Sequence, residues 1–209
     1  MRGLLLPGRG RSATRRKRTT IAPGRLLTQG TVEDRMPFQN DLAQIARGAS
    51  TMPAIEQGAK APQFKVKTSS GEEANLGGAS GKPAVLAFLK STCAYCQQEA
   101  PKLSQVVAKH KGAPVSVIGV TSGNDSEKDI GDFAKRSHLD FAWAMDPGRK
   151  VREAYGITIV PTLVFLGKDG SVAAVYEGST ERLADAVDRT MFALVSDGPL
   201  PDYAEKGSG

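Results

Sequence analysis

Apolar residues downstream of residue 60 come in short runs with two different periods. The alternation Phe64-Lys65-Val66-Lys67 is typical of a half-buried strand, whereas continuous apolar runs are typical of strands buried on both faces. Gly167-Lys168-Asp169-Gly170 separates the last two runs and predicts an antiparallel hairpin. The predicted strands lie at 61–68, 84–89, 115–120, 141–145, 162–166 and 172–176.

Between the strands, apolar residues recur every three or four positions, which predicts helices. The first follows a pair of cysteines and extends to about His110, and the second begins at Ser126 with a capping-box pattern. A short helix is expected over 147–155, and a last one from about 180 to 194. Residues 69–82 are rich in Gly and Ser and predict a loop or a hairpin. The order ββαβαβαββα predicts an α/β fold with a parallel core and an antiparallel edge.

The net charge of +6 is distributed unevenly along the 209 residues. Residues 1–51 contain ten Lys or Arg and three Asp or Glu, whereas 52–209 contain eighteen and nineteen. We interpret 1–51 as a basic, disordered tail or a mis-assigned start, with a targeting role as the alternative. The folded domain is expected over 52–196, followed by a polar tail over 197–209. Because the domain is nearly neutral, we do not expect it to bind nucleic acid.

The longest apolar run, Ala84 to Leu89, has six residues, whereas a membrane-spanning helix needs about 20. We therefore expect no transmembrane anchor. The apolar residues Leu4 to Leu6 are also too few for a signal peptide. We expect a cytoplasmic protein, with export or organelle targeting through the basic N-terminal segment as the alternative.

Both cysteines of the chain lie in Cys93-Ala94-Tyr95-Cys96, directly after a predicted buried strand and at the start of a predicted helix. Unpaired N–H groups and the helix dipole favour a thiolate at that position, so Cys93 is expected to be the nucleophile. Cys96, one turn later, is close enough to attack a mixed disulfide on Cys93. The pattern therefore predicts thiol–disulfide exchange.

Two other interpretations of the cysteine pair stay open. A single Cys-x-x-Cys is half of a tetrahedral zinc site, which His110, His138 or a second subunit would have to complete. A metal-binding module is therefore one alternative function. The two cysteines could also be buried and inert.

Several segments resemble the thioredoxin superfamily. The residues from Phe88 to Cys96 are similar to its active-site sequence, and Pro101 stands where its helices carry a proline. Tyr155-Gly156-Ile157-Thr158-Ile159-Val160-Pro161-Thr162-Leu163 resembles its segment with a cis proline. The opening Gly58 to Phe64 is similar to the TlpA/ResA-like and AhpC/TSA redoxin group, as is the insertion carrying Asn124 to Arg136.

The resemblance implies a thioredoxin-like fold, with a central mixed sheet flanked by helices and a redoxin-type N-terminal extension. It implies a thiol–disulfide oxidoreductase that acts on disulfides of protein substrates and exchanges electrons with a dithiol protein. No cofactor is expected beyond the Cys93–Cys96 disulfide, and no metal. Pro161 should be cis and face the cysteines, and the Val160 backbone should bind substrate.

Departures from the thioredoxin pattern mark residues that could tune the site. Ala87 stands where thioredoxin has a buried Asp, and Thr92 stands where it has Trp. Lys90 and Glu99 are candidates to replace the missing acid, but we favour a solvated helix residue for Glu99 and a surface charge for Lys90. Tyr95 is expected at the rim of the substrate site, with ordinary packing as the alternative.

A thiol peroxidase is the second alternative function, since peroxiredoxins share this fold group. Their pattern resembles Pro-x-x-x-Thr-x-x-Cys. Counted back from Cys93, the Thr position holds Lys90 and the Pro position holds Leu86. The hydroxyl that would position peroxide is therefore missing at its expected place.

Overall fold

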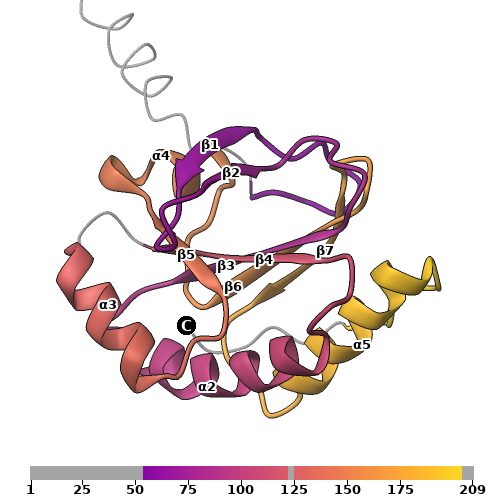
Figure 1. The fold of residues 1–209 in the computed structure, drawn as a ribbon. Helices are drawn as coiled ribbons and strands as arrows, with labels where there is room; N and C mark the ends of the chain where they lie inside the picture. The colour runs from indigo at the N-terminus through magenta and orange to yellow at the C-terminus, as the bar shows by residue number, and fades with distance from the viewer. Residues whose placement is uncertain (1–53, 122–124, 204–209) are drawn as a thin grey trace, which may run out of the picture. The chain divides into compact units, whose positions relative to one another are not determined.

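A five-stranded mixed sheet with the order β5-β4-β3-β6-β7 forms the centre of the computed structural model (Figure 1). Strand β3 pairs in parallel with β4, and β4 in parallel with β5. Strand β6 is antiparallel to both β3 and β7, which confirms the predicted hairpin at the edge. The strands are β3 (Ala84–Leu89), β4 (Ser116–Thr121), β5 (Ala142–Met145), β6 (Thr162–Leu166) and β7 (Val172–Glu177).

The structure describes residues 54–121 and 125–203. The basic segment 1–51, interpreted above as a tail or targeting segment, lies outside the described residues. Within the described ranges, no helix is long and apolar enough to cross a membrane.

Three helices cover one face of the sheet, namely α2 (Ala94–Lys109), α3 (Glu127–Arg136) and α5 (Leu183–Ser196) (Figure 1). The hairpin of β1 and β2 covers the other face, together with the short helix α4 (Figure 1). Strands β3, β4 and β5 are parallel, so α2 and α3, which follow β3 and β4, begin at the same end of the sheet. That end holds the carboxyl ends of β3 and β4.

The hairpin contains a strand that the predicted order lacks. Strand β2 (Glu73–Leu76) pairs antiparallel with β1 (Phe64–Lys67). Strand β2 has too few apolar residues for its sequence to predict a strand. It forms a strand because it pairs with β1. Gly77 follows with φ of +75°, and a Cβ atom there would lie 2.1 Å from the carbonyl oxygen of Pro62. The hairpin therefore needs glycine at this close approach.

Two helix predictions need correction. The segment 147–155 is not one helix, because Gly148 and Arg149 have positive φ angles and interrupt it. A short 3₁₀ helix, η1 (Pro147–Arg149), is followed by α4 (Lys150–Ala154). The last helix begins at Leu183 rather than near residue 180, since the preceding residues form a turn.

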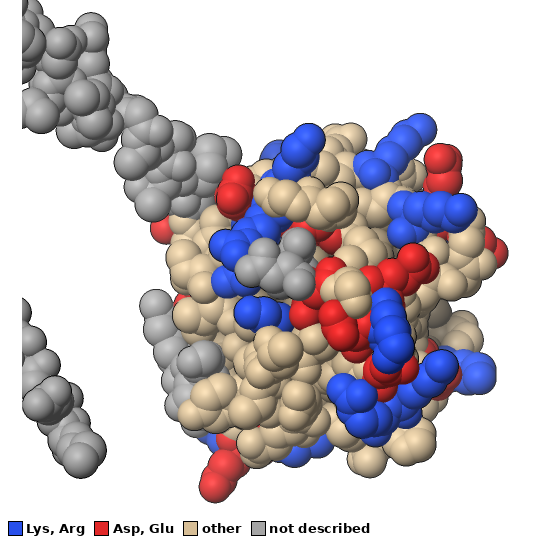
Figure 2. Space-filling view, turned by 90° about the vertical axis from the view of Figure 1, so that its left-hand side faces the viewer, with Lys and Arg blue, Asp and Glu red and all other residues tan. Residues whose placement is uncertain are grey.

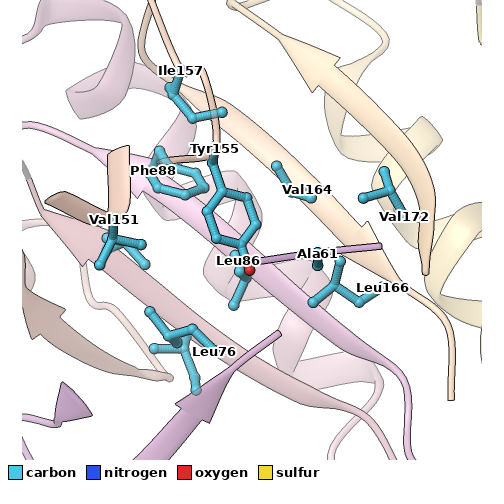
Figure 3. Packing of buried hydrophobic residues seen from close by; sticks show 12 residues of the cluster. Ala61, Leu76, Leu86, Phe88, Val151, Tyr155, Ile157, Val164, Leu166 and Val172 are labelled. Carbon is cyan, nitrogen blue, oxygen red and sulfur yellow. The ribbon is translucent and has the colours of Figure 1, made fainter. Parts of the chain in front are cut away.

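Strand β3 sends alternate side chains into cores on opposite faces of the sheet. Leu86 and Phe88 join the cluster under the hairpin, which is shown in Figure 3. Tyr155 is fully buried in this cluster and donates a hydrogen bond from its hydroxyl to the carbonyl of Pro62 at 2.7 Å. On the helical face, Val85, Ala87 and Leu89 pack under α2, α3 and α5.

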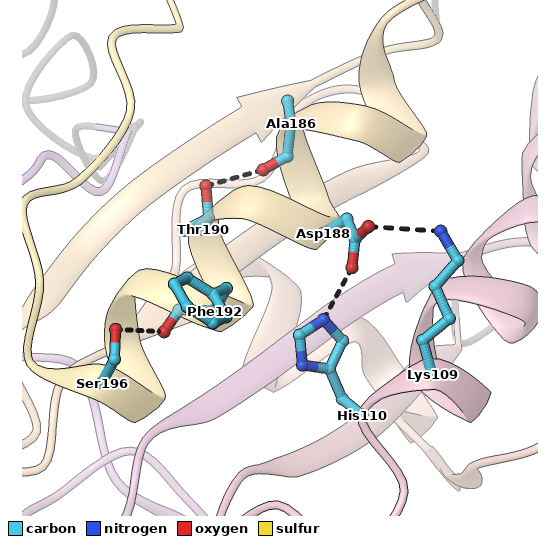
Figure 4. A network of polar contacts seen from close by, with 7 residues as sticks. All are labelled: Lys109, His110, Ala186, Asp188, Thr190, Phe192 and Ser196. Atoms are coloured by element: carbon cyan, nitrogen blue, oxygen red, sulfur yellow. Dashed lines mark hydrogen bonds and ion pairs between the residues drawn. The ribbon is translucent and has the colours of Figure 1, made fainter.

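The carboxyl end of α2 is joined to α5 by a cluster of charged side chains (Figure 4). Asp188 accepts hydrogen bonds from His110 at 2.7 Å and from Lys109 at 3.2 Å. Partial burial opposes the charge on Asp188, but these two partners lower the pKa of its carboxyl below the ordinary value. These contacts of Asp188 with Lys109 and His110 therefore hold α5 against the end of α2.

Tyr203 lies in the segment predicted as a polar tail, yet it contacts the folded domain. Its ring centroid lies 4.3 Å from that of Tyr176 on β7, and its hydroxyl hydrogen bonds with Thr180 at 2.5 Å. The packing of Tyr203 against Tyr176 thus extends the hydrophobic core as far as residue 203.

Candidate active site

Both cysteines lie at the junction between β3 and α2. Cys93 is the N-cap residue of α2, and its carbonyl accepts the first helical hydrogen bond, from Gln97 N at 3.0 Å. Its Sγ atom accepts a hydrogen bond from the N–H of Cys96 at 3.3 Å. An N–H group of the first helical turn thus points at the Cys93 sulfur, as the sequence predicted. Cys93 is partly exposed, whereas Cys96 is completely buried.

The second wall of the site is the segment that leads into β6. The Cys93 thiol donates a hydrogen bond to the carbonyl oxygen of Val160 at 3.4 Å, and the Val160–Pro161 peptide bond is cis. Arg152 supports this segment, because its guanidinium donates to the carbonyls of Ile157 at 2.9 Å and Thr158 at 2.7 Å. The proline that the resemblance implied therefore does lie beside the cysteines.

The surroundings of Cys96 favour its neutral thiol form. Burial raises the pKa of its thiol far above the ordinary value, and the hydrogen bond with Cys93 raises it further. Electrostatic interactions with Cys93 and Asp125 raise this pKa slightly more, while a hydrogen bond with the Lys90 backbone lowers it. The two cysteines thus differ in both exposure and environment.

The remaining predicted residues occupy different places. Tyr95 is 39% exposed on the first turn of α2, and Thr92 is exposed beside it. The carbonyl of Lys90 accepts a hydrogen bond from the N–H of Cys93 at 3.2 Å. These three residues therefore surround the partly exposed Cys93.

Glu99 is fully buried, so its interpretation as a solvated helix residue is wrong. Its Oε1 atom accepts hydrogen bonds from Ser179 at 2.6 Å and Lys102 at 3.0 Å. Its Oε2 atom has no partner in the structure. The packing of α2 against the segment after β7 buries this carboxylate, which periodicity in the sequence could not show.

Sequence reasoning missed three polar residues that brace the cysteine loop. Asp125 is buried, and its carboxylate accepts hydrogen bonds from the Ser91 hydroxyl at 2.6 Å and the Ser91 N–H at 3.3 Å. Gln97 donates a hydrogen bond to the Ser91 carbonyl at 2.7 Å. Asp125 follows a strand that neighbours β3, and its position after that strand was the available signal.

Figure 2 shows one face of the molecule, on which a group of acidic side chains lies next to Lys and Arg side chains. Within 54–121 and 125–203, His, Cys, Asp and Glu side chains form no group of three or more that could hold a metal ion. His110, a suggested metal ligand, lies at the other end of α2 and binds Asp188.

Residues 57–175 match the model of the AhpC/TSA family. The chain belongs to this family. It is 30% identical to the thiol-disulfide oxidoreductase ResA of Halalkalibacterium halodurans over 129 residues, which cover 61% of this chain and 73% of that protein.

Solved structures agree with this assignment. A putative thiol:disulfide interchange protein DsbE from Chlorobium tepidum is 26% identical, with a TM-score of 0.61 and coverage of 68% of this chain and 99% of its own. A secreted disulfide oxidoreductase of Mycobacterium tuberculosis is 28% identical, with a TM-score of 0.56 and coverage of 63% and 96%. The predicted thioredoxin-like fold is thus confirmed, and the protein is a thiol–disulfide oxidoreductase with a Cys-x-x-Cys pair.

Proposed function

We propose that this AhpC/TSA-family oxidoreductase reduces disulfides of protein substrates, with Cys93 as the attacking and Cys96 as the resolving cysteine. The observation that carries the proposal is the difference in exposure between the two sulfurs. Cys93 is partly open at the start of α2, whereas Cys96 is completely buried. A substrate disulfide can therefore reach Cys93 and cannot reach Cys96.

The reaction has two exchange steps. The Cys93 thiolate attacks one sulfur of the substrate disulfide, which forms a mixed disulfide and releases a substrate thiolate. Cys96 then attacks the Cys93 sulfur, its proton passes to the departing second substrate sulfur, and the Cys93–Cys96 disulfide forms. Two electrons have moved from the dithiol to the substrate. An external dithiol protein returns them, and no dissociable cofactor takes part.

Residues around Cys93 supply the substrate contacts of this proposal. The backbone before Pro161 lies against the Cys93 sulfur, with the Val160 carbonyl 3.4 Å away. An extended substrate segment placed along this backbone would add strand-like hydrogen bonds. Tyr95 and Thr92 offer exposed side chains at the opposite rim. Lys90 supports the loop through its carbonyl.

The redox midpoint of the full chain, equilibrated in thiol buffers and followed by thiol-labelling mass spectrometry, tests the direction of electron flow. A two-electron midpoint near or below about −250 mV is expected for a reductase and fits the cytoplasmic location predicted above. A midpoint near about −120 mV would mean an oxidant and fit export, as for the secreted relative. The absence of a reversible two-electron couple would overturn the proposal.

Trapping with a disulfide-bonded protein substrate tests the roles of the cysteines. Cys96→Ser should accumulate a covalent complex through Cys93 that a reductant dissolves. Cys93→Ser is the matched control and should trap nothing. Equal trapping by both variants would contradict the assigned order.

A further inference from the structure

The loop that leads into β6 is held in place by groups outside it. Residues 157–161 connect α4 to β6 and belong to no helix or strand. Each carbonyl group of this loop nevertheless accepts a hydrogen bond. The donors are Arg152 Nε to Ile157 at 2.9 Å, Arg152 Nη2 to Thr158 at 2.7 Å, the Thr162 hydroxyl to Ile159 at 2.9 Å, Cys93 Sγ to Val160 at 3.4 Å and Gly178 N to Pro161 at 2.7 Å. Side chains thus supply most of the bonds that a strand would receive from its neighbour.

One of these donors is lost when the protein reacts. The Cys93 thiol has no proton to donate once it is a thiolate or part of a disulfide, so its bond to Val160 cannot last through the reaction. The guanidinium of Arg152 stays protonated and keeps its donors. Arg152 binds two of the loop carbonyls, whereas each other donor binds one. Arg152 is therefore the main side chain that holds this loop in every redox state.

Arg152 is itself fixed to the sheet. The carboxylate of Asp146 is buried and accepts hydrogen bonds from the N–H groups of Val151 at 3.0 Å and Arg152 at 2.9 Å. Asp146 directly follows β5, and its own N–H donates to the carbonyl of Thr121, at the end of β4, at 3.2 Å. The Arg152 carbonyl also accepts from the N–H of Ile157 at 3.0 Å. The guanidinium thus extends from a backbone that is tied to both strands.

The shape of the guanidinium suits this contact. Its N–H groups form a fixed planar fork, and two of them reach two successive carbonyls at the same time. Within 54–121 and 125–203 the Arg152 guanidinium forms no ion pair, and these carbonyls are its hydrogen-bond acceptors. A lysine ammonium is a single point of charge and does not match two acceptors in the same way. The geometry therefore favours arginine over lysine at this position.

We propose that Arg152 is a positioning residue, which keeps the Val160 backbone in the place where a protein substrate pairs with it. Arg152 acts through the loop in this role and does not touch the substrate. An extended substrate segment gains strand-like hydrogen bonds at lower entropic cost when the backbone beside Cys93 is already ordered. The inference rests on the function and the substrate contacts proposed above.

Two kinds of disulfide should respond differently to the loss of Arg152. A protein disulfide reaches Cys93 together with its flanking peptide backbone, which binds beside Val160. Hydroxyethyl disulfide has no peptide groups and needs only access to the Cys93 sulfur. Loss of the Arg152 contacts should therefore weaken the reaction with a protein far more than the reaction with the small disulfide.

The test compares insulin with hydroxyethyl disulfide as substrates of the full chain. Steady-state reduction of insulin, with dithiothreitol as the electron source, gives KM and kcat. The rate constant for hydroxyethyl disulfide is measured on the reduced protein by thiol-labelling mass spectrometry. Arg152→Met should raise the KM for insulin roughly tenfold, as for the loss of one or two hydrogen bonds, and should change kcat and the small-disulfide rate constant little. Equal effects on the two substrates, or an unchanged KM, would overturn the proposal.

Lys150→Met is the matched control for charge. Lys150 is exposed and begins the same helix, so its replacement removes one positive charge without removing a contact to the loop. This variant should keep the parental values for both substrates. A rise in KM equal to that of Arg152→Met would assign the effect to charge and refute the positioning role.

Arg152→Lys keeps the charge but matches the two carbonyls less well, so its KM for insulin should rise by less than that of Arg152→Met. If Arg152→Met does not fold, Arg152→Lys decides the proposal, because a KM equal to the parental value overturns it. Failure of the proposed function is distinct from either result, since the parent itself would then lack a two-electron couple and would not reduce insulin.

Discussion

Two acids from other elements lie at the two ends of α2, in contrasting surroundings. At the carboxyl end, Asp188 is shared by Lys109 and His110, and the cluster holds α2 against α5. At the amino end, Asp125 is more deeply buried, and Ser91, a neutral residue, binds both of its oxygens. Asp188 thus has two basic side chains as partners, whereas the hydrogen bonds of Asp125 within the described residues go to the neutral Ser91. The two acids therefore differ in what they connect: Asp188 links α2 to α5, and Asp125 braces the loop that leads to Cys93.

The largest expected difference between the two ends concerns turnover. Cys93→Ser removes the attacking sulfur and should reduce the reduction of a protein disulfide to the uncatalysed level, with little change in the thermal unfolding midpoint. His110→Ala at the other end should leave turnover unchanged and lower that midpoint. A Cys93→Ser variant that retains turnover would place the chemistry elsewhere.

Glu99 provides a third buried acid, between the two ends, whose expected contribution is to stability. Glu99→Ala removes the acceptor for Ser179 and Lys102 and should lower the free energy of unfolding by about 2 kcal/mol in urea titrations. Glu99→Gln keeps an oxygen for Ser179 and should cost less. If the two variants were equally destabilised, the Ser179 contact would not be the source of the effect.

Cys96 makes the stability of the reduced protein depend on pH. Its thiol pKa is raised in the folded state, mainly by burial, whereas an unfolded cysteine titrates near about 8.5. The contribution of the buried Cys96 thiol to the free energy of unfolding is complete below the pKa of the unfolded cysteine. As pH rises above that pKa, the unfolded chain loses the proton whereas the folded protein keeps it. The free energy of unfolding of the reduced protein should thus fall by about 1.4 kcal/mol per pH unit above that pKa.

Urea titrations of the reduced protein at several alkaline pH values measure this slope. Cys96→Ser is the control and should show a shallower one, because Ser does not titrate in this range. Parallel curves for the two proteins would mean that Cys96 is not held neutral in the folded state.

The smallest effect is expected at the carboxyl end of α2. Asp188→Asn should destabilise the protein by about 0.5 kcal/mol at neutral pH, as is usual for partly exposed pairs. The pKa of Asp188 is lowered, so its contribution is complete above about pH 4 and is lost as pH falls through the folded value. Thermal melts from neutral to acid pH should show the difference disappearing. A persistent difference would exclude the carboxylate charge as its source.

Local patterns in the sequence predicted most of the fold because strands and helices follow apolar periodicity. The run from Ala84 to Leu89 and the turn over 167–170 were interpreted correctly, and the helix after Cys93 follows from its spacing. Strand β2 was missed because its pairing with β1 defines it and its own side chains do not. The break at Gly148 and Arg149 was missed because backbone angles alone reveal it.

The candidate site, too, has features that the sequence predicted and features that only the structure shows. The sequence by itself determined where the two sulfurs lie, since Cys93 and Cys96 are one turn apart at the start of one helix and an N–H group of that turn points at Cys93. Only the tertiary structure decided how the acids near α2 are placed. Asp125 reaches Ser91 through the register of β3 and β4, Glu99 is buried by contact with Ser179, and Asp188 finds Lys109 and His110 on another helix. Such contacts depend on the distance between chain segments in space, which no local pattern encodes.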